Sequence, residues 1–112
     1  MQRGEIWLVN LDPTIGSEIK KTRPAVIVSS DLVGVLPLKI IVPITEWKER
    51  YSSAAWMVRI DPDVQNGLRK SSAADGLQVR SVSHQRLVKR VGILTPVKVA
   101  QIVQAILNVL QR

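Results

Sequence analysis

The stretch Thr22-Arg23-Pro24-Ala25-Val26-Ile27-Val28-Ser29 sets an arginine at the start of an uninterrupted apolar run. Pro24 restricts its predecessor to extended geometry, so Arg23 is predicted to begin a β-strand rather than lie in a helix. The run Pro24–Ser30 lacks polar alternation, which is typical of a strand buried on both faces. A strand end would hold the guanidinium donors in place, and their fork suits phosphate oxygens. On spacing alone, an ordinary solvated arginine remains the simpler interpretation.

Further strands are predicted on both sides of this stretch. They are Glu5–Leu11, Leu38–Thr45, Ala54–Ile60, Gly76–Val82 and Val88–Leu94. Pro43, near the end of its segment, predicts an edge strand or a bulge. Apolar and polar residues alternate after Gly76, so Gln78 and Arg80 are predicted to share the solvent-facing side of one strand.

The last segment predicts one amphipathic helix. Thr95-Pro96 supplies a cap and a proline at the first helical position, and apolar residues then recur at helical spacing from Val97 to Leu110. Short strands followed by one helix predict a mainly β fold, namely a small, strongly bent antiparallel sheet or open barrel with the helix packed on it. A chain of 112 residues is enough for one domain, residues 1–112, with one modest core.

Charge and composition limit the possible partners. Sixteen basic and nine acidic residues give a net charge of +7, which favours a polyanion or a strongly acidic protein as partner. The absence of cysteine rules out disulfides and thiolate metal sites and fits a reducing cytoplasm. No apolar run reaches the length of a membrane span, and the N-terminus leads directly into a strand pattern without a signal peptide.

Several kinds of catalytic site find little support in the residues. The only histidine, His84, lies in a predicted surface turn, and Asp61 and Asp63 flank a proline as turn residues do. A catalytic metal site needs several convergent ligands, so neither a metal nor another cofactor is predicted. There is no Gly-x-Ser-x-Gly turn for a serine nucleophile and no glycine-rich loop of the nucleotide-binding kinds.

What remains is metal-free chemistry on a polyanion. RNA carries its own nucleophile, the 2′-hydroxyl, so cleavage needs alignment, stabilisation of developing charge and proton transfer. Arg23 suits charge stabilisation and is a poor proton acceptor at neutral pH. Trp56 is a candidate surface on which a base could stack, although Trp7 and Trp56 could also be core residues; Trp47 is predicted to be exposed.

The chain resembles the MazF/PemK family of toxin endoribonucleases over nearly its whole length. The resemblance is carried, in order, by Arg3-Gly4-Glu5-Ile6-Trp7, Asp12-Pro13-Thr14, Gly16-Ser17-Glu18, Thr22-Arg23-Pro24-Ala25-Val26-Ile27-Val28, Val42-Pro43-Ile44-Thr45, Gln78-Val79-Arg80-Ser81-Val82 and Arg86-Leu87. It implies an SH3-like barrel with a C-terminal helix, assembled as a homodimer. It also implies metal-independent cleavage of single-stranded RNA, with mRNA as the target, and inhibition by an acidic, flexible antitoxin.

The resemblance also assigns roles to individual residues. The family's catalytic arginine and hydroxyl correspond to Arg23 and Thr45. Its RNA-binding positions correspond to the following residues: Ser17, Glu18, Trp56, Gln78 and Arg80. The chain departs from members of the family in three places: Leu77 stands where several have an acidic residue, Ser17 where some have a histidine, and Ile19 where many have a glutamine.

Two other functions were weighed against the endoribonuclease. A gyrase-poisoning toxin of the related barrel family would use an apolar Trp-Gly-Ile tail, whereas this chain ends Leu110-Gln111-Arg112. A basic RNA-binding module without catalysis would not need both Arg23 and Thr45. The endoribonuclease is therefore the favoured interpretation.

Overall fold

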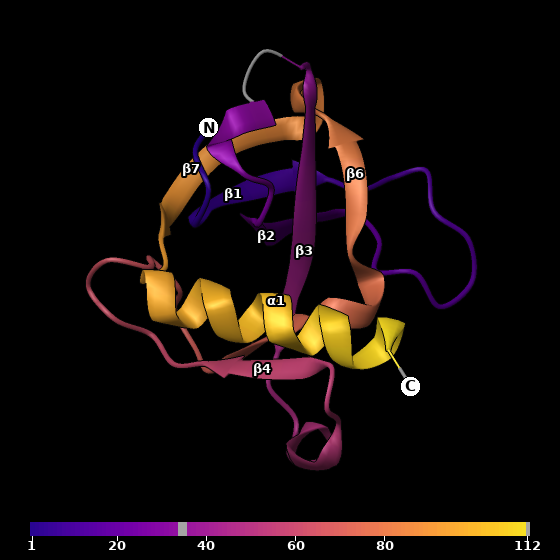
Figure 1. The fold of residues 1–112 in the computed structure, drawn as a ribbon, viewed down its shortest axis with the longest axis vertical. Helices are drawn as coiled ribbons and strands as arrows, with labels where there is room; N and C mark the ends of the chain where they lie inside the picture. Colours follow the sequence, from indigo (N-terminus) through magenta and orange to yellow (C-terminus); the bar gives the residue numbers. More distant parts are fainter. Residues whose placement is uncertain (34–35, 112) are drawn as a thin grey trace.

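A computed structural model describes residues 1–33 and 36–111 of the chain. Its elements in chain order are β1 (Glu5–Asn10), β2 (Thr22–Ile27), β3 (Leu38–Glu46), β4 (Met57–Ile60), β5 (Ser72–Asp75), β6 (Arg80–Ser83), β7 (Leu87–Ile93) and α1 (Pro96–Leu110). The strands form one antiparallel sheet that bends strongly, with α1 lying across it (Figure 1). The predicted mainly β fold with one C-terminal helix is confirmed.

Strand β3 is the centre of the sheet. One of its edges pairs with β2, while the other pairs first with β6, along Leu38–Ile41, and then with β5, along Ile44–Glu46. Pro43 lies in the interval between these two partners and is paired only with Ala25 of β2. The prediction of an edge position for Pro43 was therefore wrong. A proline has no N–H to donate, so it fits the place where a central strand changes partners.

Two apolar clusters lie on opposite faces of the sheet. The helix-side core joins strand residues to α1, and its members are Ile6, Val26, Val28, Val42, Ile44, Ile60, Ala74, Leu94, Val99 and Ile102. The inner core lies on the other face of the sheet, and its members are Val9, Leu11, Ala25, Ile27, Ile41, Val82 and Leu87. Burial of β2 on both faces, as its apolar run predicted, follows from this arrangement.

The helix begins as the sequence predicted. The Thr95 hydroxyl accepts a hydrogen bond from the Lys98 amide at 3.2 Å, and Pro96 occupies the first turn. Val99, Ile102 and Ala105 are buried on the side that faces the sheet. Within the part of the chain that the structure describes, no helix is both long and apolar enough to cross a membrane.

The segment predicted as one strand, Gly76–Val82, is divided. Strand β5, which the sequence analysis missed, ends at Asp75; the short 3₁₀ turn η3 (Gly76–Gln78) follows, and β6 begins only at Arg80. A Cβ on Gly76 would lie 3.0 Å from the Trp56 carbonyl oxygen and 3.3 Å from the Ile106 amide nitrogen. The chain bends there because β5 and β6 pair with successive parts of the same edge of β3.

The loop between β4 and β5 packs closely against β7. A Cβ on Gly92 would lie 2.4 Å from three backbone atoms of Gln65 and Asn66. A Cβ on Gly67, whose φ is +69°, would lie 2.3 Å from the Val91 carbonyl oxygen. The Gln65 carbonyl accepts a hydrogen bond from the Ile93 amide at 3.0 Å. Only glycine permits backbone contacts this close on both sides.

Replacing Gly92 with alanine should destabilise the protein by about 1–3 kcal/mol, because the added methyl group must displace backbone rather than a flexible side chain. Urea unfolding checks this, with Val88→Ala on the same strand as the control. The Val88 side chain is 63% exposed, and its loss should change the free energy of unfolding by less than about 0.5 kcal/mol. Equal unfolding midpoints for the two variants would contradict the described contact.

Candidate functional site

A groove of about 510 Å3 opens between the β1–β2 loop and the chain that runs from η3 into β6. Its lining consists of Ser17, Glu18, Ile19, Pro43, Leu77, Gln78, Val79 and Arg80. Ile19 and Val79 pack against the inner core and the helix-side core respectively. The groove therefore brings together four residues that the sequence analysis had singled out from two distant segments, Ser17 and Glu18 from the loop and Gln78 and Arg80 from the η3–β6 segment.

Gln78 fastens the two walls of the groove to each other. Its side-chain oxygen accepts a hydrogen bond from the Ile19 amide at 2.6 Å, and its side-chain nitrogen donates to the Ser17 carbonyl at 3.2 Å. Because Gln78 lies in η3, the prediction that it shares a strand with Arg80 was wrong. The side-chain amide of Gln78 instead bonds to backbone groups of the β1–β2 loop, accepting from one and donating to another as a neighbouring β-strand would.

Two arginines hold the start of the same loop. Arg80 donates from Nη1 to the Leu11 carbonyl at 3.1 Å, and Arg86 donates to the Asn10 carbonyl at 3.0 Å and also to the Asp12 carbonyl. Part of the hydrogen-bonding capacity of each guanidinium thus holds the backbone of the loop. The positive charge of Arg80 also remains at the groove, which this residue lines. Arg86 was quoted in the family resemblance but was given no role, and only the folded chain reveals its contact with the loop.

Glu18 stabilises the turn of the loop. Its carboxylate accepts a hydrogen bond from the Ile15 amide at 2.6 Å, and its own amide donates to the Ile15 carbonyl at 3.2 Å. Gly16 between them has a φ of +60°, which glycine adopts without steric cost. Glu18 is the only acidic residue in the lining of the groove.

Arg23 and Thr45 lie at the same end of neighbouring strands. The β2–β3 register pairs Ala25 with Pro43, so alternation puts Arg23 and Thr45, each two residues further along, on the same face as that pair. Pro43 on this face lines the groove. Arg23 is exposed, and its Nε donates only a long hydrogen bond, 3.4 Å, to the Lys20 carbonyl. Its charged group is therefore free to meet a ligand.

Thr45 has an aromatic neighbour on its own face of the sheet. Thr45 pairs with Ala73, which in turn pairs with Arg59, so the three side chains point to one side. The Arg59 guanidinium lies 5.1 Å from the centre of the Trp47 ring, and Trp47 contacts Tyr51 edge to face at 6.0 Å. The sequence analysis named Trp47 as exposed but gave it no role; it is half-buried here.

Trp56 is not part of the groove lining. It precedes β4, and its carbonyl accepts a hydrogen bond from the Gly76 amide at 2.8 Å. The strand residues of the same parity, Val58 and Ile60, pack in the helix-side core, away from the face of Thr45. The side chain is half-exposed. Its contact with a base therefore stays a prediction.

The carboxylate closest in sequence to Gln78 is turned inward. Asp75 is 6% exposed, and it caps η3 by accepting a hydrogen bond from the Leu77 amide at 3.1 Å. Burial raises the pKa of Asp75, while the hydrogen bonds from the Leu77 and Gln78 amides oppose this rise. Leu77 itself is 59% exposed at the groove. The groove lining therefore has no acidic side chain at Leu77, the position where several members of the MazF/PemK family carry one.

Other candidate chemistry stays outside the groove. His84 is exposed in the short turn His84–Arg86, as the sequence predicted, and its amide donates to the Pro37 carbonyl. Among residues 1–33 and 36–111, no three His, Asp or Glu side chains cluster in the way that metal ligands do.

Comparison with known proteins gives this geometry a family. The family model described as "PemK-like, MazF-like toxin of type II toxin-antitoxin system" matches residues 2–110. Endoribonuclease MazF9 of Mycobacterium tuberculosis is 31% identical over 112 residues, which cover 95% of this chain and 92% of that protein.

Solved structures share the fold. Crystalline MazF from Deinococcus radiodurans superposes with a TM-score of 0.81 at 20% identity, over 98% of this chain and 96% of its own. A MazE–MazF structure from the same organism superposes with a TM-score of 0.72 at 16% identity, over 98% and 94%. From the match over residues 2–110 and the likeness to MazF9, the chain belongs to the PemK-like, MazF-like toxins of type II toxin–antitoxin systems, a family of endoribonucleases.

Proposed function

We propose that this endoribonuclease cleaves single-stranded RNA at short sequences by attack of the 2′-hydroxyl on the adjacent phosphate, without a metal ion. The observation that carries the proposal is the shared face of Arg23, Thr45 and the groove-lining Pro43. An RNA strand laid along the groove would present one phosphate to the exposed Arg23 guanidinium, which has no acidic partner in the described residues.

Arg23 and Thr45 are the proposed catalytic residues. As the 2′-oxygen loses its proton and bonds to phosphorus, negative charge grows on the two non-bridging oxygens before the bond to the 5′-oxygen breaks. The Arg23 guanidinium can donate to both oxygens in a fork, and its charge persists throughout the reaction. The Thr45 hydroxyl can donate one further hydrogen bond from the neighbouring strand. Water takes up the proton of the 2′-hydroxyl and supplies one to the departing 5′-oxygen, so the step yields a 2′,3′-cyclic phosphate and a 5′-hydroxyl.

The RNA-binding residues act on either side of this phosphate. Ser17 and Glu18 lie in the β1–β2 loop, and Gln78 holds that loop in place. The guanidinium donors of Arg80 that do not bind the Leu11 carbonyl would face the RNA strand. Bases splayed from single-stranded RNA need flat surfaces to stack on. Trp56 is the aromatic that the family resemblance assigns to this role, and Trp47 is the one on the face of Thr45.

The partners follow from charge and family. The groove carries one carboxylate, Glu18, and is flanked by cations, so an acidic, flexible antitoxin segment is the proposed inhibitor. The MazE–MazF structure from Deinococcus radiodurans, which shares the fold, supports a protein partner for this chain. The free toxin would degrade mRNA in the cytoplasm and so stop translation and growth.

Cleavage should continue in excess chelator, because the nucleophile is the 2′-hydroxyl and the proposed catalytic groups are Arg23 and Thr45. Sequencing of the new ends of a mixed RNA reports both the site preference and the chemistry. Fragments should carry a 2′,3′-cyclic or 3′-phosphate upstream and a 5′-hydroxyl downstream. A 2′-O-methyl group at the cut site should block the reaction. Ends with 5′-phosphate and 3′-hydroxyl would instead indicate attack by water and overturn the mechanism.

Replacing Arg23 with alanine should slow cleavage at least about a hundredfold, since loss of a donor aimed at developing charge costs on the order of 3 kcal/mol in the barrier. The melting temperature should hardly move, because an exposed arginine contributes about 0.5 kcal/mol or less to stability. Thr45→Val keeps the shape and removes the hydroxyl, and it should also slow cleavage without unfolding the protein.

Lys20→Ala is the matched control for these variants. It removes one exposed charge from the loop that precedes β2, three residues before Arg23, so it should weaken RNA binding slightly and leave the rate at saturating RNA unchanged. Cleavage at the parent rate by Arg23→Ala would remove Arg23 from the active site. Unfolding of that variant would give Arg23 a structural role instead.

The toxin should be a homodimer in solution. Several apolar side chains are exposed within one segment of the described chain, among them Leu32 at 97%, Leu36 at 50% and Leu38 at 48%. Surface of this kind is typical of a protein contact. Light scattering at micromolar concentration should give twice the monomer mass. A monomer with full activity would refute the prediction.

A further inference from the structure

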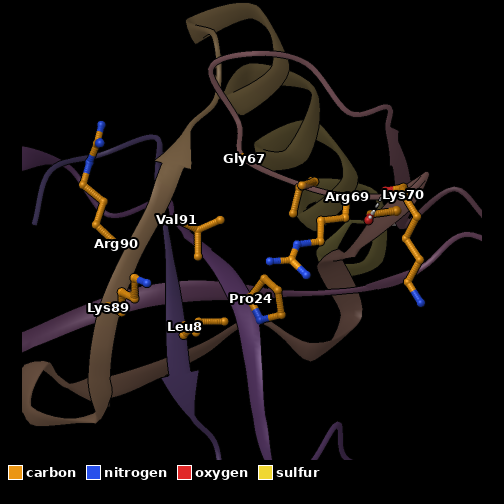
Figure 2. A pocket seen from close by; sticks show the side chains of 10 residues that line it. Leu8, Pro24, Gly67, Arg69, Lys70, Lys89, Arg90 and Val91 are labelled. Atoms are coloured by element: carbon orange, nitrogen blue, oxygen red, sulfur yellow. Dashed lines mark hydrogen bonds between the residues drawn. The ribbon is translucent and has the colours of Figure 1, made fainter.

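A second cavity, of about 490 Å3, lies apart from the groove, beneath the loop between β4 and β5 (Figure 2). Leu8 of β1, Pro24 of β2 and Val91 of β7 give it an apolar floor. Four basic residues contribute to its lining, namely Arg69, Lys70, Lys89 and Arg90. No acidic residue belongs to the lining. A cavity with an apolar floor and only cations at its edge suits an anion that also carries a flat apolar group.

Two of the four cations are already paired elsewhere. Arg90 binds Glu5 at 3.1 Å, and Lys70 binds Glu46 at 3.3 Å. In Figure 2 both side chains extend away from the floor of the cavity. Burial alone would raise the pKa of Glu5, but hydrogen bonds from the Gln2 amide and the Trp7 indole, together with the N-terminal ammonium, lower it to about 2. Glu5 is therefore ionised at neutral pH and keeps Arg90 occupied.

Arg69 and Lys89 are the cations left for a ligand. Neither forms an ion pair within the described residues. Figure 2 shows the Arg69 guanidinium directed between Pro24 and Val91, and Lys89 lies beside Leu8, its partner in the β1–β7 register. All nine carboxylates of the chain accept hydrogen bonds from other groups of the protein. Within the described residues, no acidic side chain that lines the cavity competes with an external anion.

The wall that carries Arg69 is held in place before any ligand binds. Asn66 is 1% exposed, and its side-chain nitrogen donates to the Asp61 carbonyl at 2.9 Å. Its side-chain oxygen accepts from the Leu68 amide at 3.0 Å and from the Asp63 amide at 3.2 Å. Together with the close glycine contacts to β7, these bonds fix the loop. A preformed wall lowers the ordering cost of binding.

We propose that this cavity binds one nucleotide of the RNA substrate, outside the bond that is cleaved, with its base on the apolar floor and its phosphates on Arg69 and Lys89. The inference rests on the proposed function. RNA is favoured over an acidic peptide because the cavity lies one strand residue away from the candidate active site, on the opposite face of the same strands: Pro24 directly follows Arg23, and Leu8 adjoins Val9, the register partner of Arg23. A strand that leaves Arg23 around the end of β2 reaches this cavity next.

The test compares RNA binding by the parent and by Arg69→Ala/Lys89→Ala. Both probes carry a 2′-O-methyl group at the cut site. The short probe covers only the cleaved sequence, and the long probe extends it on both sides. The variant should bind the long probe about tenfold more weakly or worse. The slope of the logarithm of the binding constant against the logarithm of salt concentration should become about 1.4 less steep, since each of the two lost phosphate contacts on a single strand contributes about 0.7. Binding of the short probe and its cleavage in unblocked form should be unchanged.

Lys48→Ala/Arg50→Ala is the charge-matched control, because it removes two exposed cations that do not line the cavity. This control should retain more of the extra affinity for the long probe over the short probe than the Arg69→Ala/Lys89→Ala variant retains. Equal losses in the two double variants would mean general attraction to a basic surface and would overturn the proposal.

Three further outcomes would also overturn it. The cavity variant could bind both probes as the parent does, it could lose affinity for the antitoxin alone, or it could change its mass in light scattering. The last two would assign the cavity to a protein contact. A parent that fails to cleave unblocked RNA would refute the proposed function, whereas the blocked probes would still report on the cavity.

Discussion

The change of partners along β3 is the constraint on which the groove depends. The strand pairs with β6 up to Ile41 and with β5 from Ile44, and Pro43 lies where neither partner reaches. The chain must cross this interval between β5 and β6, and η3 is the crossing. Gln78 therefore arrives opposite the β1–β2 loop and holds it by two backbone hydrogen bonds. A continuous strand from Ser72 to Ser83 would close the interval and leave the loop without this partner.

The acidic side chains of the protein bond to other groups of the chain, whereas several of its basic side chains have no acidic partner. The nine acidic side chains accept hydrogen bonds from backbone amides, hydroxyls, an indole or basic groups of the same chain. Asp63 and Asp75 cap turns, and Glu18 closes the loop turn. Arg23, Arg69 and Lys89 have no carboxylate partner in the described residues. Part of the net charge of +7 is thus carried by cations without an acidic partner near two hollows, where it can act on a polyanion.

Two successive residues of β2, Arg23 and Pro24, face the two different hollows. Successive side chains of a strand point to opposite faces, so Arg23 lies on the face of the groove and Pro24 lines the second cavity. The proline that holds Arg23 in extended geometry also supplies apolar floor on the other side. The same dipeptide therefore links a proposed cleavage site to a proposed nucleotide site.

The sequence by itself determined the local elements and the family. Alternation and apolar runs predicted six of the seven strands, the Thr95 cap predicted the start of α1, and the ordered motifs around Arg23 and Thr45 indicated the toxin family. Strand β5 escaped prediction because Ser72, Ala73 and Ala74 carry little apolar bulk, and their burial comes from neighbours distant in sequence. Only the tertiary structure decided that Gln78 binds the β1–β2 loop, that Arg59 packs on Trp47, and that Arg69 and Lys89 line one cavity. These arrangements join segments that are separated in the chain, and periodicity indicates only which face a residue takes, not which residue lies opposite it.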